Sequence, residues 1–118
     1  MPRFPAGTIV IVDWRGDARP KEPNKLRPAV VVEDTELFAT DYPNIVVVPL
    51  TGNGELAVPT LSVTIEPTAE NGCSKRCHAV APSVTAVSLE RVQGTSSHVT
   101  AEQLSRLRAL IAEAIGVG

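Results

Sequence analysis

The sequence predicts a β-rich domain, a strongly bent antiparallel sheet of the small-barrel kind with one helix packed against it. Segments rich in Val and Ile fill the first three-quarters of the chain. Most of the ten prolines stand at the boundaries of these segments. The spacing between segments is too short for intervening helices, which favours antiparallel pairing. With 118 residues, of which 43% are hydrophobic, we expect a single domain over residues 1–118.

Six segments are expected to be strands, because they are rich in Val and Ile and lie between clusters of Gly, Pro, Asn and Asp. They are Thr8–Val12, Ala29–Val32, Ile45–Leu50, Ser62–Ile65, His78–Ala81 and the short Ala86–Ser88. Proline cannot donate a hydrogen bond to a sheet ladder, so the prolines suit the ends and edges of these strands.

The last element is expected to be an amphipathic helix. Thr100 is its N-cap, Gln103 occupies the capping-box position, and Gly116 marks its end. Large apolar side chains recur at helical spacing, at Leu104, Leu107, Leu110, Ile111 and Ile115. Burying each of them would contribute about 1.5–3 kcal/mol, so we expect the helix to pack on the sheet rather than on a partner chain.

Charge restricts the possible partners. The formal net charge is −2, so the chain as a whole has no excess of positive charge for nucleic acid. The segment from Arg15 to Arg27 is an exception, with five cations against two anions and a local charge of +3, although an ordinary solvated loop could have this composition. No run of about 18 apolar residues is present, so no membrane span is expected. The first residues lack the apolar core of a signal peptide, and we therefore expect a cytoplasmic protein.

The two cysteines have a spacing that metal ligands can have. Cys73 and Cys77 are followed by His78, and His98 is a conceivable fourth ligand. Structural zinc sites usually combine two such pairs, and the second pair is missing here. We therefore expect two reduced thiols and no metal or other cofactor, with zinc or a disulfide as the alternatives.

The most informative stretch runs from Gly7 to Thr51. A strand ends near Trp14, a basic loop follows, Arg27-Pro28 leads into a second strand, and a third strand ends at Thr51. This order places a guanidinium and a hydroxyl at the ends of two β-elements beside a positive loop. Such groups can hold a phosphodiester, which makes RNA the leading substrate.

The order of these pieces resembles the MazF/PemK family of toxin endoribonucleases from type II toxin–antitoxin modules. Its most specific part is Arg-Pro-Ala-Val-Val-Val, followed about twenty residues later by Val-Val-Pro-Leu-Thr. The matching segments cover nearly the whole chain, namely Gly7–Val10 with Trp14, Arg27–Val32, Val46–Thr51, Asn71–Arg76 leading into His78–Arg91, and the terminal helix.

The resemblance implies an SH3-like, strongly bent β-barrel, usually a homodimer, that cleaves single-stranded RNA such as mRNA without a metal. The substrate's own 2′-hydroxyl would be the nucleophile, leaving a 2′,3′-cyclic phosphate and a 5′-hydroxyl. A cognate antitoxin protein, partly acidic and partly disordered, would neutralise the toxin by laying an extended segment through the RNA groove.

Arg27 and Thr51 are the candidate catalytic residues. In-line attack builds negative charge on the phosphate oxygens, which a fixed guanidinium stabilises through parallel donors. Thr51 matches the family's strand-end threonine and could hydrogen-bond the scissile phosphate. The residues alone leave open a surface ion pair for Arg27 and a local backbone cap for Thr51.

The candidate RNA-binding residues lie around the basic loop. Trp14 could stack on a base and contribute roughly 1–3 kcal/mol, although a lone tryptophan in a small domain often belongs to the core. The remaining cations would contact phosphates without reading the base sequence. These cations are Arg15, Arg19, Lys21 and Lys25.

The later strand departs from the family pattern. Many relatives carry an acidic residue and a glutamine there, then an arginine, where this chain has Pro82-Ser83 and then Thr85. A proline cannot replace a carboxylate in proton transfer. His78 could compensate, because histidine suits proton transfer near neutral pH, and a structural histidine is the alternative.

Three other functions are weighed against RNA cleavage. A gyrase-inhibiting toxin of this fold relies on a tryptophan near the C-terminus, and the tail Ala114–Gly118 has none. A module that binds proline-rich peptides needs an aromatic-lined groove, which is hard to build from one Trp, one Tyr and two Phe. A degenerate relative would bind RNA or antitoxin and cleave slowly, and Pro82 is the residue that favours it.

Overall fold

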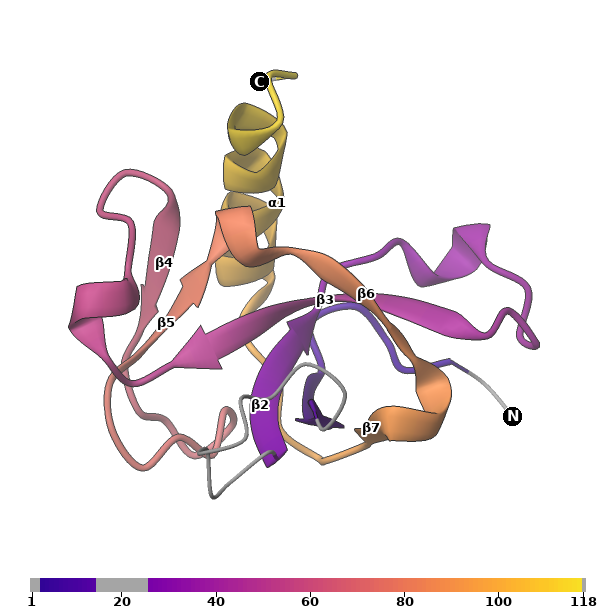
Figure 1. Cartoon of the computed structure of the whole chain (residues 1–118). Coiled ribbons are helices and arrows are strands. Elements are labelled where there is room, and N and C mark those ends of the chain that lie inside the picture. The colour runs from indigo at the N-terminus through magenta and orange to yellow at the C-terminus, as the bar shows by residue number, and fades with distance from the viewer. Residues whose placement is uncertain (1–2, 15–25, 118) are drawn as a thin grey trace.

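The apolar runs of the sequence form an antiparallel sheet (Figure 1). The computed structural model describes residues 3–14 and 26–117, and within them the chain has seven strands and one α-helix. The strands are β1 (Ile9–Asp13), β2 (Leu26–Val31), β3 (Asn44–Thr51), β4 (Ser62–Ile65), β5 (Cys77–Val80), β6 (Thr85–Ser88) and β7 (Val92–Gln93). The helix α1 spans Ala101–Ala114.

The long strand β3 is shared between two parts of the sheet. The strand order is β4-β5-β3-β2-β1-β7, with β6 paired to β3 outside this path. The first half of β3 pairs with β6 and its middle, Val47 to Pro49, pairs with β2. Its last residues, Leu50 and Thr51, pair with Ala79 and His78 of β5. The sheet therefore bends along β3, and its outer strands β4 and β7 are not paired with each other in the described part of the chain. The predicted class is confirmed, with a sheet that is bent but not closed.

Strands β1 to β3 are covered on both faces, which explains their uninterrupted apolar sequence. Alternate residues point to opposite sides of a strand, so Val10 and Val12 enter one core cluster while Ile9 enters the other. The first cluster also contains Ala29, Val31, Ile45 and Val47. The second cluster joins β1–β3 to β4, β5 and α1, through residues such as Val48, Val63, Ala79, Leu107 and Leu110.

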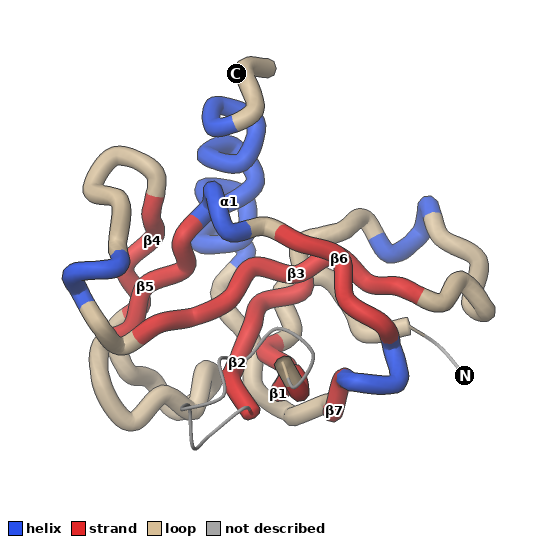
Figure 2. Tube along the Cα trace, in the orientation of Figure 1, coloured by secondary structure: helices blue, strands red, loops and turns tan. Residues whose placement is uncertain are grey.

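The helix α1 packs beside β4 and the turn that follows β5 (Figure 2). The predicted capping box is confirmed, because Gln103 N donates to Thr100 Oγ1 at 3.0 Å and Thr100 N donates to Gln103 Oε1 at 2.9 Å. Leu107 and Leu110 are buried. The expectation for Ile115 is wrong, since the helix ends at Ala114 and the side chain of Ile115 is 66% exposed. Within the described residues, α1 and the short helical turns lack the length and apolar character needed to cross a bilayer.

The predicted strand ends mostly agree with the structure to within one residue, and two differences are larger. The strand β2 begins at Leu26 rather than Ala29, because Arg27 and Pro28 pair with Val12 and Ile11 of β1. The strand β7 was not predicted, since its two residues give no periodic pattern.

A buried ion pair fixes the N-terminal segment to the sheet. Arg3 Nη2 lies 2.8 Å from Glu33 Oε2, and both side chains are 1% exposed. Glu33 Oε1 also accepts a hydrogen bond from Val46 N at 3.0 Å. Arg108 of α1 donates to the carbonyl oxygens of Val32 and Glu33, each at 2.9 Å, so the helix is attached at the same place.

We expect Glu33→Gln to lower the free energy of unfolding by about 3–5 kcal/mol, because the buried Arg3 charge would lose its ionic partner. The matched control is Glu66→Gln, which removes the exposed pair with Arg76, and its cost should be about 1 kcal/mol or less. Urea unfolding curves measure both values. Equal effects of the two substitutions would contradict the role given to the buried pair.

Candidate functional site

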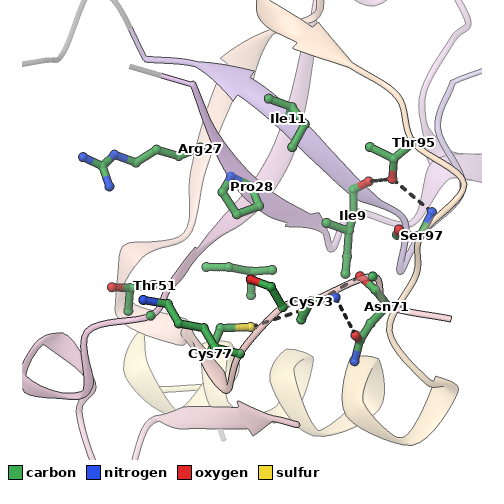
Figure 3. A pocket seen from close by; sticks show the side chains of 15 residues that line it. Ile9, Ile11, Arg27, Pro28, Thr51, Asn71, Cys73, Cys77, Thr95 and Ser97 are labelled. Carbon is green, nitrogen blue, oxygen red and sulfur yellow. Dashed lines mark hydrogen bonds between the residues drawn. The ribbon is translucent and has the colours of Figure 1, made fainter. Parts of the chain in front are cut away.

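A pocket of about 550 Å³ opens where β2 and β3 separate (Figure 3). Its apolar floor includes Ile9 and Ile11 of β1, Pro28 of β2 and Leu50 of β3. The opposite wall is the loop before β5, from Asn71 to Lys75, together with Cys77. Among the described lining residues there are two cations and no carboxylate, so the pocket favours an anionic ligand.

Arg27 lies at the rim of this pocket. It is the second residue of β2, and its pairing with Val12 holds its backbone in the sheet. The side chain is exposed and extends outward from the strand end, toward the side where Thr51 lies (Figure 3). The guanidinium is therefore placed to meet a ligand at the mouth rather than at the floor.

Thr51 lies at the end of β3 and lines the same pocket. Its Oγ1 accepts a hydrogen bond from Asn53 N at 3.1 Å, which is the local cap left open by the sequence. This bond uses an oxygen lone pair, so the hydroxyl hydrogen can still be donated to a ligand oxygen. The structure thus brings Arg27 and Thr51 to one pocket.

The wall that faces them is held by Asn71, which is buried. Its Oδ1 accepts from Thr68 N at 3.0 Å and from Cys73 N at 2.9 Å, and its Nδ2 donates to Glu66 O at 2.8 Å. Gly72 follows with a φ of +64°, a conformation that favours glycine. These bonds fix the path of the loop toward β3.

Lys75 is the second cation of the pocket and was not among the residues predicted for the site. Its side chain lies against the backbone of Gly52, where an added Cβ would come within 2.5 Å of Lys75 Cε and 2.9 Å of its Nζ. Gly52 therefore permits the close approach that brings this ammonium beside Thr51. The sequence shows only a basic pair, Lys75-Arg76, after an Asn-Gly turn, and it does not reveal this contact.

His78 does not line the pocket but is the direct cross-strand neighbour of Thr51. Its Nδ1 lies 3.3 Å from Thr64 Oγ1 on β4, and its Nε2 lies near the backbone of Gly54. Directly opposite residues in an antiparallel pair present their side chains on the same face. His78 thus lies on the strand next to that of Thr51 and two strands away from Arg27.

Of the predicted RNA-binding residues, the structure describes only Trp14, which does not line the pocket. Trp14 packs against the core cluster around Val12, and its Nε1 is buried with no hydrogen-bond partner among the described residues. These contacts support the core role that the sequence left open. Arg15, Arg19, Lys21 and Lys25 lie outside the described residues.

The positions that depart from the family pattern form a turn. Residues Ala81–Ser83 make a short helical turn between β5 and β6, in which Pro82 and Ser83 are exposed. Thr85 then begins β6 and pairs with Val47. The pocket described here does not include them.

The two cysteines lie side by side in the pocket wall. Both are free thiols, and their sulfur atoms are 3.5 Å apart. Burial, followed by the hydrogen bond and charge of Cys73, raises the pKa of Cys77 to about 12. His98 bonds instead to the carbonyl of Val99, and among the described residues no three His, Cys, Asp or Glu side chains gather as a metal site.

Comparison with known proteins identifies one family and several solved structures of the same fold. The family described as PemK-like, MazF-like toxin of type II toxin-antitoxin system matches residues 6–115. Among solved structures, the chain is similar to Mycobacterium tuberculosis toxin MazF-mt6, with 17% identity, a TM-score of 0.72, and coverage of 94% of this chain and 98% of that one. No curated protein sequence matches the chain.

Two further structures have the same fold. MazF from Deinococcus radiodurans is 19% identical, with a TM-score of 0.72 and coverage of 96% of each chain. An endoribonuclease in complex with its cognate antitoxin, from a mycobacterial species, is 16% identical, with a TM-score of 0.71 and coverage of 98% of each chain.

We expect iodoacetamide at about pH 8 to alkylate Cys73 well before Cys77. The thiolate is the reactive form, and the raised pKa and burial of Cys77 leave it protonated and covered. Trypsin cleaves after Lys75 and Arg76, so the two cysteines fall on separate peptides whose labelling mass spectrometry can follow. Equal labelling rates in the folded protein, with both sites labelled fully in urea, would contradict this environment.

Proposed function

Since the chain belongs to the PemK-like, MazF-like toxin family of type II toxin–antitoxin systems, we propose that this toxin cleaves single-stranded RNA without a metal ion. The observation that carries the proposal is that Arg27 and Thr51, near the ends of two adjacent strands, line the same pocket. Lys75 adds a second positive charge at the same mouth. These are the groups needed to hold a phosphodiester.

The proposed reaction is attack of the RNA 2′-hydroxyl on the adjacent phosphorus. The P–O5′ bond breaks and the departing 5′-oxygen takes up a proton from solvent, leaving a 2′,3′-cyclic phosphate and a 5′-hydroxyl. Arg27 stabilises the charge that develops on the non-bridging oxygens, and such a donor typically accounts for about 2.7–4 kcal/mol of the barrier. The hydroxyl of Thr51 donates to the same phosphate, and Lys75 neutralises a neighbouring one.

The proton of the attacking hydroxyl needs an acceptor. Among the titratable residues described near Thr51, His78 is its direct neighbour across β3 and β5. We propose His78 as the group that accepts this proton, through the ring nitrogen that does not face Thr64. Pro82 cannot fill this role, because it carries no titratable group.

The proposed partners follow from the fold. Two structural neighbours are complexes of a toxin with its antitoxin, namely the mycobacterial endoribonuclease and MazE-MazF from Deinococcus radiodurans. We propose that a cognate antitoxin binds this chain over the positive pocket, and that the toxin acts as a homodimer. An acidic segment would complement Arg27 and Lys75.

A second candidate function is a relative that binds RNA or antitoxin but cleaves slowly. The observation that favours it is the lack of a carboxylate among the described residues that line the pocket, together with the turn at Pro82. Binding would then depend on the same cations without efficient proton transfer.

Purified protein incubated with a long single-stranded RNA in EDTA should give discrete fragments with 5′-hydroxyl ends. The ends can be identified because polynucleotide kinase labels them without prior phosphatase treatment. Intact RNA at micromolar protein, with RNA binding retained, would instead support the slowly cleaving alternative. Cleavage that EDTA abolishes would contradict a metal-independent reaction.

Arg27→Ala should lower the cleavage rate by on the order of 10²–10³ while leaving the melting curve unchanged, because the side chain is exposed and acts on the ligand. The matched control is Arg106→Ala, which removes an exposed cation from α1 outside the pocket. Single-turnover cleavage of one RNA by the three proteins makes the comparison. A wild-type rate for Arg27→Ala would remove Arg27 from the site.

A further inference from the structure

The pocket wall contains a pair of thiols that the proposed RNA cleavage does not use. Cys73 is partly exposed to the pocket, whereas Cys77 at the start of β5 is 8% exposed. Their sulfur atoms are 3.5 Å apart, and a disulfide bond requires about 2.05 Å. A shift of about 1.5 Å in a loop would therefore be enough to join them.

We propose that Cys73 and Cys77 form a redox-modification site, in which a small-molecule disulfide such as oxidised glutathione converts the pair to an intramolecular disulfide and alters the pocket mouth. The more exposed Cys73 reacts first. The buried Cys77 then forms the disulfide bond with Cys73. The positive charges of Arg27 and Lys75 line the same pocket and suit an oxidant that carries carboxylates.

The chemistry balances without another reactant. The thiolate of Cys73 attacks one sulfur of the oxidant, forming a mixed disulfide and releasing one thiolate. Cys77 then gives up its proton and attacks the Cys73 sulfur of the mixed disulfide, which expels the second thiolate. The two protein thiols lose two electrons and two protons, and the oxidant leaves as two thiol molecules.

The pair is connected to the pocket mouth by the chain between the cysteines. Asn71 fixes the Cys73 end through the bond from Cys73 N, and β5 fixes the Cys77 end. Lys75 lies midway between them, with its side chain against Gly52. Drawing the two sulfurs together therefore moves Lys75 relative to Gly52. The consequence for RNA rests on the proposed function, in which Lys75 holds a phosphate.

Disulfides in partly exposed loops are the readily reduced kind, which suits a reversible change rather than a structural bridge. Cys77 belongs to a core cluster and Cys73 packs against it, so the bond would join two side chains that are already neighbours, and we expect the reduced and oxidised proteins to share one fold. The pairing of Thr51 with His78 should persist in the oxidised protein.

The first experiment maps the bond in the full chain incubated with graded ratios of oxidised to reduced glutathione. We expect the protein to lose two hydrogen masses and its trypsin peptides to become linked through Cys73 and Cys77. Cys77→Ser should instead retain one glutathione on Cys73. A stable glutathione adduct on the wild-type protein, or no reaction under conditions that modify Cys77→Ser, would overturn the proposal.

The second experiment measures the effect on the pocket. A short oligonucleotide with 2′-deoxy sugars, which cannot undergo the reaction, should bind the oxidised protein about tenfold more weakly by fluorescence anisotropy, and dithiothreitol should restore its affinity. Cys73→Ser should bind equally before and after oxidant treatment. Equal binding by both redox forms of the wild type would overturn the coupling to the mouth.

A readout independent of RNA separates this inference from the proposed function. Hydrogen exchange in the peptide around Gly52 should become faster upon oxidation, because the cover provided by Lys75 moves away. Unchanged exchange would overturn the coupling even if the disulfide forms. Loss of RNA binding and cleavage in both redox forms would count against the proposed function alone, since the peptide map and the exchange do not depend on RNA.

Discussion

The structure depends on a change of partner along β3. Its pairing with β2 reaches Pro49, which faces Ala29, and the next residue, Leu50, pairs with Ala79 of β5. Pro49 has no N–H to donate, so it suits the position at which one ladder ends and another begins. Because β2 and β5 lie on opposite sides of β3 and β2 pairs with it only as far as Pro49, the end of β3 separates from β2 and leaves an opening beside Thr51. The pocket lies in this opening, and the loop fixed by Asn71 closes it on the opposite side.

Polar and charged side chains lie together at this opening because several structural elements begin or end there. Arg27 is near the start of β2, Thr51 is the last residue of β3, and the loop fixed by Asn71 brings Lys75 across to Gly52. Each backbone is fixed by strand pairing or by buried hydrogen bonds, so the main chain that carries these side chains needs little ordering when a ligand binds. An apolar floor beneath two cations lowers the local dielectric and strengthens their attraction for a phosphate.

Much of the fold could be predicted because its elements have strong local patterns. The Val- and Ile-rich runs of β3 and β4 and the capping box at Thr100 depend on neighbouring residues alone. Elements that depend on distant contacts were missed. The two-residue strand β7 exists only through its pairing with β1, and Ile115 follows helical spacing but lies beyond the last helical residue.

The same distinction applies to the site. The positions of Arg27 and Thr51 near strand ends could be predicted from turn residues, and their proposed roles came from the family pattern, whereas the placement of Lys75 depends on its approach to Gly52. The sequence also could not decide between stacking and packing for Trp14, since both use an aromatic ring at a strand end. Likewise, the spacing of Cys73 and Cys77 does not reveal that their sulfur atoms are 3.5 Å apart.

The central claim is that a nucleic-acid backbone occupies the opening between β2 and the end of β3, which the loop before β5 faces. Its most direct test is an NMR titration of the isotope-labelled protein with a non-cleavable single-stranded oligonucleotide. The account predicts that the largest amide shift changes cluster at Thr51, Gly52, Gly72 and Lys75, on both walls of the pocket. Changes confined to the outer edge of β6 and the turn after it, with the pocket resonances unmoved, would contradict it.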